Sequence, residues 1–490
     1  MINLSPVLSR TWQPHIPKCK LRHPVEAVIK SASTDDLSNK DPNVSQRRII
    51  FFVIFTVVII GTSYILVGRD AVNLSASTST SVSLGVDNIS PTNITKTTDE
   101  LITFWHNRFE RDPRDYISLT YLGQAYINKA RETGDAGFYT RAEAALQEAL
   151  TLNPNYETGL AFLASVFFAQ HNFQEALDLA NRVYAFDPRA LHALATSGDA
   201  HLELGHYAEA EIAYRTLNEK NPSPPVFSRL ARLAWLQGQP DKALGSMQQA
   251  VTEAEALGLT GEQLAWYHFQ LGELYFNTGQ VAAAQKQYTL SLEQFPNYYL
   301  GLVGLGKAQA AQSDFEAAIE FYQRSTAIVP QPDFLAALGD LYHIVGQPNQ
   351  AQQQYDTVEF IGKLAEVNQQ IYNRQLANFY TDHDLHLAEA LKLAAAELEI
   401  RQDIYGLDTA AWAYYKNGQL DKAQAMIEQA LQLGTRDAKL YYHAGMIAQA
   451  QGDVAQAEHL LAEALTINPH FDLLQADIAQ ATLDQLRAIE

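Results

Sequence analysis

The sequence predicts an all-α, right-handed superhelical solenoid of about ten helix-turn-helix repeats, and a 34-residue period is the main reason. Pro154, Pro188 and Pro222 are spaced 34 residues apart, and so are Pro296 and Pro330. A fixed period of this length is typical of stacked helical units, each of which buries its apolar face only against its neighbours. Such a chain forms a long curved surface rather than a closed catalytic pocket. The sequence therefore indicates a binding or scaffolding class of activity.

Residues 1–48 precede the repeats and are predicted to form a disordered cytoplasmic tail. They are rich in Pro, Ser, Asp, Asn and Lys and follow neither a helical nor a strand period. Cys19 is the only cysteine of the sequence. No disulfide and no CxxC zinc or redox pair is therefore expected.

Residues 49–67 contain no charged side chain and are predicted to form one transmembrane helix. At ~1.5 Å per residue this segment spans roughly 28 Å, close to the ~30 Å of a bilayer core. Lys40, Arg47 and Arg48 precede it, and a single Arg follows closely. The positive-inside rule therefore predicts a cytoplasmic N-terminus and an extracytoplasmic repeat region. A cleaved signal peptide with a small-residue site near Ser75 is the alternative.

Residues 68–98 are rich in Ser and Thr and are predicted to be a flexible linker between the membrane helix and the repeats. A flexible chain of this length has a reach on the order of 30 Å. Asn73, Asn88 and Asn93 each begin an N-x-S/T sequon, which would matter only in a eukaryotic secretory pathway.

Residues 271–296 show the repeating unit most clearly, with a first helix, a glycine that ends it, and a second helix that a proline ends. Small residues recur where helices must approach closely, and aromatic residues fill the space beside them. The positions that carry the pattern are Leu271, Gly272, Tyr275, Gly279, Ala284, Tyr288 and Pro296. This pattern resembles the tetratricopeptide repeat. The resemblance implies ten units over residues 99–470.

Residues 471–490 are predicted to form a C-terminal capping helix. A terminal repeat needs a polar outer face. The polar residues expected to face outward on this helix are Asp472, Gln475, Asp477 and Gln480. Upstream of it, residues 401–453 are similar to part of a group of bacterial tetratricopeptide proteins of unassigned function, which implies a bacterial source and no particular mechanism.

The resemblance also implies a peptide groove, because in this family one face of each first helix lines the inner surface. The residues that this face brings into the groove are Trp235, Trp266, Phe269, Glu273, Phe276, Asn277 and Lys307. Converging aromatic side chains can hold the apolar side chains of an extended segment. The alternative is that some of these aromatic residues belong to the core between repeats.

Arg374, Asn378 and Lys439 are further groove residues, on the first helices of the eighth and tenth units. With Thr409 and His443 they resemble the carboxylate clamp by which some chaperone-binding relatives hold a C-terminal carboxylate. Thr409 stands where a clamp has Asn, and His443 where it has a cation. Solvated helix faces are the alternative.

The sequence predicts no catalytic, cofactor-binding or metal-binding site, and hence no enzyme. No GxSxG, P-loop, HExxH or GxGxxG motif stands in a supporting context. The one dense His/Asp cluster is Asp382, His383, Asp384 and His386. It falls at a predicted turn, where such residues more often cap helices than bind zinc.

The distribution of charge bears on the partner. The chain has a formal net charge of −20, yet residues 1–48 are net basic, so the repeats are strongly acidic. An acidic surface repels phosphate backbones, which excludes nucleic acid and favours basic or neutral polypeptides. The alternative is that the acidic excess only keeps a large surface soluble.

Taken together, these features predict a membrane-anchored protein-protein interaction scaffold that binds other proteins or extended peptides, with no small-molecule substrate. The alternative is a structural component of a bacterial envelope-assembly or export complex.

Overall fold

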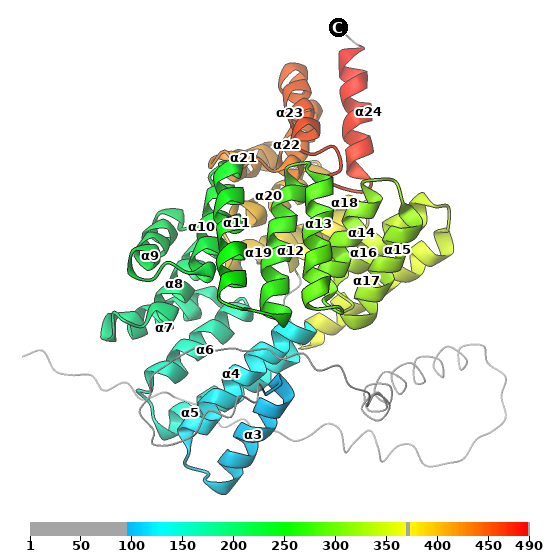
Figure 1. The fold of residues 1–490 in the computed structure, drawn as a ribbon. Helices are drawn as coiled ribbons and strands as arrows, with labels where there is room; N and C mark the ends of the chain where they lie inside the picture. The colour runs from blue at the N-terminus through cyan, green and yellow to red at the C-terminus, as the bar shows by residue number, and fades with distance from the viewer. Residues whose placement is uncertain (1–95, 369–372, 489–490) are drawn as a thin grey trace, which may run out of the picture. The chain divides into compact units, whose positions relative to one another are not determined.

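The computed structural model describes residues 96–368 and 373–488, which contain 22 α-helices and no strand (Figure 1). The predicted tail, the predicted membrane helix at 49–67 and nearly all of the linker lie outside these residues. Among the helices that are described, none combines the length and the apolar character needed to cross a bilayer.

Ten helix pairs, numbered here as units 1 to 10, follow one another along the chain, in agreement with the predicted all-α solenoid. The helices of units 1 to 5 are α4 (Tyr116–Thr133), α5 (Gly137–Leu152), α6 (Glu157–Ala169), α7 (Phe173–Phe186), α8 (Leu191–Glu203), α9 (Tyr207–Lys220), α10 (Pro224–Leu236), α11 (Pro240–Ala256), α12 (Gly261–Asn277) and α13 (Val281–Gln294). Those of units 6 to 10 are α14 (Tyr299–Ala310), α15 (Phe315–Ile328), α16 (Pro332–Ile344), α17 (Pro348–Asn368), α18 (Asn373–Asp382), α19 (Leu387–Ile400), α20 (Ile404–Lys416), α21 (Leu420–Leu431), α22 (Ala438–Gln451) and α23 (Val454–Ile467). A single helix precedes the units, α3 (Thr98–Arg111), and another follows them, α24 (Gln475–Arg487).

The packing of unit 5 explains why small residues recur with the period. Gly279 ends the turn after α12 with a φ of 73°, a conformation that glycine adopts without strain. The ring of Tyr288 on α13 is fully buried and lies between two glycines. A Cβ atom would lie 2.5 Å from this ring if built on Gly272 of the same unit, and 2.3 Å from it if built on Gly304 of the next unit. The two glycines therefore create the space in which adjacent units pack.

The C-terminal helix begins later than predicted. The expected start was residue 471, whereas α24 begins at Gln475. The carboxylate of Asp472 accepts hydrogen bonds from the backbone N–H groups of Leu474 and Gln475, both at 3.0 Å, and so caps the helix. The side chain of Gln475 is buried, at 3% exposure, so the prediction that Gln475 faces outward is wrong. Residues 468–474 are not helical, and we call them the strap.

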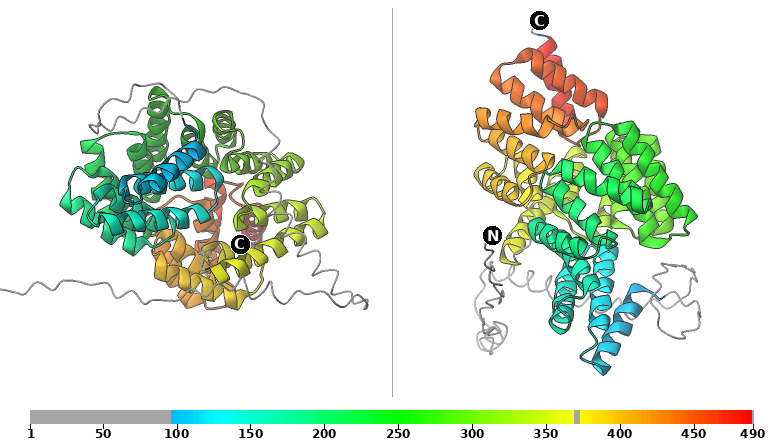
Figure 2. Two further views of the ribbon diagram at one scale, coloured as in Figure 1. Left: turned by 90° about the horizontal axis from the view of Figure 1, so that it is seen from below. Right: turned by 90° about the vertical axis from the view of Figure 1, so that its left-hand side faces the viewer.

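The described helices wind so far that the end of the chain returns to the earlier units (Figure 2). The contacts join residues 192 to 199 positions apart. The hydroxyl of Thr435 donates to the carbonyl of Leu236, and the side-chain amide of Asn468 donates to the carbonyl of Phe276 at 3.0 Å. We call this line of contacts the seam. Units 3 to 5 are therefore covered in part by units 8 to 10.

A buried ion network lies at one end of the seam. The carboxylate of Glu203, at the end of α8, forms ion pairs with both Arg232 and Arg401, and Nε of Arg401 lies 2.8 Å from it. The guanidinium of Arg401 also lies 5.0 Å from the ring centre of Phe173. Burial alone would raise the pKa of Glu203, but the two arginines outweigh it and lower that pKa. Each buried charge is thus paired, as a buried ion requires.

Candidate peptide-binding groove

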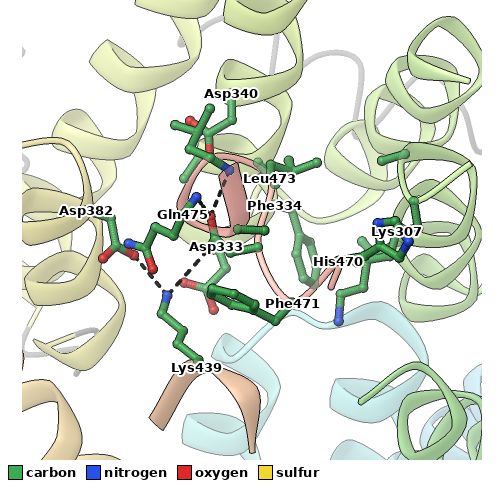
Figure 3. Close-up of a pocket in the computed structure, with 18 of the residues that line it drawn as sticks. Lys307, Asp333, Phe334, Asp340, Asp382, Lys439, His470, Phe471, Leu473 and Gln475 are labelled. Carbon is green, nitrogen blue, oxygen red and sulfur yellow. Dashed lines mark hydrogen bonds and ion pairs between the residues drawn. The ribbon is translucent and has the colours of Figure 1, made fainter. Parts of the chain in front are cut away.

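A cavity of about 740 Å³ lies on the inner face of the solenoid, among α12, α14, α16, α18 and the strap (Figure 3). The first helices of units 5 to 8 form its walls, and Lys439 of α22 reaches it from unit 10. In the left view of Figure 2 the helices surround the segment that precedes α24. Groove and strap therefore face one another inside the solenoid.

Eight of the ten predicted groove residues line this cavity. They are Phe269, Glu273, Phe276, Asn277, Lys307, Arg374, Asn378 and Lys439. The rings of Phe269 and Phe276 are largely buried, at 7% and 6% exposure, so only their edges reach the cavity. The aromatic residues of α12 are therefore mostly core, and the surface of the cavity is about equally polar and apolar.

The other two predicted residues, Trp235 and Trp266, do not line the cavity. Trp235 is 6% exposed, and its indole N–H donates to the hydroxyl of Tyr405 at 3.0 Å across the seam. Trp266 packs beside Tyr267, with ring centres 5.1 Å apart, against the core of units 4 to 7. Both tryptophans therefore pack in the core or at the seam, which is the alternative that the sequence left open.

A repeated polar pattern fixes the charged residues of the inner face. In unit 5, Glu273 follows the packing glycine Gly272. Its carboxylate accepts a hydrogen bond from the hydroxyl of Tyr288 at 2.6 Å and one from Lys307 of the next unit at 2.8 Å. The same arrangement occurs in unit 3 with Asp199, Tyr214 and Arg229, and in unit 7 with Asp340, Tyr355 and His383. In each case the tyrosine lies 15 residues after the acid. We call this the acid ladder, and it holds the inner carboxylates in fixed positions.

Comparison with known proteins agrees with this architecture. Family models described as tetratricopeptide repeat match residues 167–233 in one case, and residues 127–190, 269–331 and 409–470 in another. The chain contains tetratricopeptide repeats. Such repeats generally mediate protein-protein interaction, and proteins built from them are generally non-enzymatic scaffolds.

Solved structures of other tetratricopeptide proteins are similar at low identity. A thermophilic protein of Thermus thermophilus is 21% identical, over 41% of this chain and 98% of its own, with a TM-score of 0.32. Yeast Tom70 is 14% identical, over 80% and 93%, with a TM-score of 0.35. A protein from Parabacteroides merdae is 19% identical, over 56% and 98%, with a TM-score of 0.31. The search of curated proteins found no match.

The tetratricopeptide clamp pattern is only partly accessible. Lys439 lies 3.0 Å from Asp382 and 3.6 Å from Asp472. Burial would lower the pKa of Lys439, but these two carboxylates raise it above its usual range. Thr409 and His443 are buried, at 2% and 1% exposure. Neither of these two side chains is therefore available to a ligand in the groove.

The His/Asp cluster of unit 8 is dispersed over separate interactions. The carboxylate of Asp382 accepts hydrogen bonds from the indole N–H of Trp412, at 2.8 Å, and from the ammonium group of Lys439. Asp384 pairs with Lys416, and His386 lies 3.3 Å from Glu359. In the described ranges no group of three His, Cys, Asp or Glu side chains is placed to hold a metal ion.

His383, the remaining member of this cluster, lies at the cavity. One ring nitrogen faces the carboxylate of Asp340 and the other the carbonyl of Phe379, both at 2.7 Å. Both neighbours are acceptors, so the imidazolium form satisfies both contacts. Burial would lower the pKa of His383, but these hydrogen bonds and the charge of Asp340 raise it.

The sequence did not identify several residues of the cavity, among them Asp333, Phe334, Asp340 and the strap residues. Asp340 could have been found, because it follows Gly339 just as Glu273 follows Gly272. Asp333 lines the cavity with an exposed side chain, and no hydrogen bond or ion pair joins that side chain to another residue of the described ranges. The protein around the cavity raises the pKa of Asp333 by burial, and nearby cations offset this in part.

Proposed function

We propose that this protein is a membrane-anchored interaction scaffold that binds an extended polypeptide segment in the groove of units 5 to 8. The observation that carries the proposal is the convergence of eight predicted groove residues on one cavity of about 740 Å³. Pockets of this size, with apolar edges and a few fixed polar groups, suit side chains of a bound ligand. The acid ladder supports it, because it keeps carboxylates in place without ligand.

We further propose that the partner is basic or neutral. Six carboxylates line the cavity: Glu273, Asp333, Asp340, Asp382, Asp472 and Asp477. Lys307 and Lys439 are already paired with carboxylates, and Arg374 lies 3.9 Å from Asp403. An added anion would therefore meet a net negative wall, whereas a cationic side chain would meet an attractive one.

The proposed arrangement in the cell is a cytoplasmic tail at 1–48, a single transmembrane helix at 49–67 and a linker at 68–98. The repeats are then extracytoplasmic, and the membrane helix is the only membrane contact. No cofactor or catalytic role is part of the proposal. Its support is the uncharged 49–67 segment and the cations that precede it.

The test is site-specific photocrosslinking of the full-length chain in intact cells. A crosslinking amino acid replaces Asn277 or Asn378 in the groove, or Ile212 of α9 as a matched control, whose side chain is 67% exposed. Defined polypeptides should crosslink at the two groove positions and not at the control. Crosslinks at all three positions, or at none, would contradict groove binding.

A structural component of an envelope-assembly or export complex is the second candidate. The observation in its favour is the strap, which already fills part of the groove. A spacer should crosslink through its outer helices to subunits that co-purify in fixed proportion. Under that function, substitution of Lys307 by Glu would leave the set of co-purifying proteins unchanged.

A further inference from the structure

The strap has the contacts of a peptide seated in the groove. At its start, the side-chain amide of Asn468 donates to the carbonyl of Phe276 on α12 at 3.0 Å. Further along, Phe471 packs on Tyr442 with ring centres 5.4 Å apart, and Asp472 lies 3.6 Å from Lys439. Aromatic, ionic and backbone contacts therefore follow one another over a few residues, as they do in a bound extended segment.

The strap also joins two cores that the helical pairing leaves separate. Leu473 packs against the core of units 5 to 7, whereas Phe471 packs against the core of units 9 and 10. Helical connection alone does not require this path. The link between α13 and α14 needs only residues 295–298, while the strap takes residues 468–474. The additional length of the strap lets the chain pass from α23 into the groove and continue to the start of α24.

The strap fills only part of the groove, because its residues form one wall of the 740 Å³ cavity. Figure 3 shows Phe471 and Leu473 beside Phe334 in this wall. The side chains of Phe471, Asp472 and Leu473 are half-buried. Because these three side chains are only partly buried, a competing segment can reach the positions that they occupy.

We propose that the strap is an internal occupant of the groove, and that the partner is an extended segment of the same chemistry that takes its place. This partner would present an aromatic residue to Tyr442, a carboxylate to Lys439 and an aliphatic residue to the core of units 5 to 7. The inference rests on the proposed peptide-binding function. It adds one carboxylate at a defined position to a partner that is otherwise basic or neutral.

Mass action gives the expected size of the competition. A tethered segment has an effective concentration on the order of millimolar or higher. A free peptide must therefore overcome this concentration in the wild-type chain, and its apparent affinity falls by the fraction of chains with an empty groove. Weakening of the strap should restore that affinity.

The test uses the full-length chain and a fluorescently labelled synthetic peptide with the sequence of residues 467–477. Phe471→Ala combined with Leu473→Ala should free the groove, so this variant should bind the peptide at least about tenfold more tightly than the wild type. Ile478→Ala combined with Gln485→Ala changes only exposed residues of α24 and should bind like the wild type. A peptide that carries Ala in place of its Phe and its first Asp should bind at least about tenfold more weakly to the freed variant.

Equal binding of the peptide to the wild type and to a folded freed variant would overturn the proposal. If circular dichroism shows that the freed variant is unfolded, hydrogen exchange of the wild type decides. Millimolar unlabelled peptide should then speed exchange at the amides of Leu474 and Gln475, which Asp472 holds. Unchanged exchange at these amides would refute the inference. Crosslinking at Asn277 in cells tests separately whether the groove binds a polypeptide. Failure of the proposed function can therefore be distinguished from failure of the inference about the strap.

Discussion

Alanine at Gly272 tests whether adjacent units depend on the space around Tyr288. A Cβ atom built on Gly272 lies 2.5 Å from Cε1 of that ring. The ring has little room to move away, because its hydroxyl donates to Glu273 and because Gly304 of the next unit also lies against its Cδ1 and Cε1 atoms. Real Cβ atoms do not approach so closely, so the substitution must shift α12 or α13.

The magnitude follows from two opposing effects. Overpacking of a well-packed core costs about 1–3 kcal/mol. Replacing Gly by Ala inside a helix stabilises it by about 1 kcal/mol. The net loss at Gly272 should therefore be up to about 2 kcal/mol. Gly245 on α11 is the matched control, since a Cβ there meets no atom within 4 Å, and Gly245→Ala should show only the gain.

Native-state hydrogen exchange is the appropriate assay, because a solenoid need not unfold in one step and local opening must be measured. The opening free energy of α12 to α14 should fall in Gly272→Ala, while that of α10 and α11 should rise in Gly245→Ala. The difference between the two changes isolates the overpacking cost of about 1–3 kcal/mol. Equal changes of the same sign would refute the claim that glycine at 272 is needed for packing.

Three further outcomes are expected. Gly238 has a φ of 67°, and a Cβ atom built on it lies 2.1 Å from the carbonyl oxygen of Gly434 across the seam. Gly238→Ala should therefore lower the melting temperature more than Gly258→Ala, because Gly258 has a similar φ of 70° but its built Cβ meets no atom within 4 Å. Equal decreases of the melting temperature would contradict the close seam contact between Gly238 and Gly434. Burial, together with the charge of a nearby arginine, lowers the pKa of His171 to about 4. As the pH falls below ~6.5, the unfolded chain therefore binds a proton at this histidine before the folded chain does. Between pH 7 and pH 4 the free energy of unfolding should fall by about 2–3 kcal/mol more in the wild type than in His171→Asn. Unfolding curves of the two proteins at each pH provide the measurement, and parallel pH profiles would exclude this role. Deletion of residues 49–67 should release the protein from membranes, and a compartment reporter at the C-terminus should read outside the cytoplasm; a cytoplasmic signal would reverse the proposed orientation.

The periodic part of the fold could be predicted from the sequence because it depends on contacts between neighbouring units. Gly272, Ala284 and Tyr288 lie within one repeat, and their spacing recurs, so a local pattern predicts the packing. The same reasoning placed Glu273 and Lys307 on the inner face, where the structure brings them to one cavity. Residues whose environment is set by the repeat were thus accessible to prediction.

The tryptophans show where this reasoning fails. Trp235 occupies an inner-face position in its unit, but the hydroxyl of Tyr405, 170 residues away, covers it. No periodic pattern encodes that partner, because it depends on how far each unit rotates relative to the last. The late start of α24 has a similar origin, since the strap leaves the helical path to contact α12 and α22.

The seam combines apolar and polar contacts between units that lie far apart in the sequence. Ile404 and Leu440 belong to the same buried apolar cluster as Trp235 and Leu236, and the hydroxyl of Thr435 donates to the carbonyl of Leu236. Each hydrogen bond contributes only about 0.5–1.5 kcal/mol net, whereas full burial of one large aliphatic side chain contributes about 1.5–3 kcal/mol. The seam should therefore stay closed while the half-buried side chains of the strap leave the groove. Under the proposed function, strap release rather than seam opening is then the way by which a partner segment enters the groove.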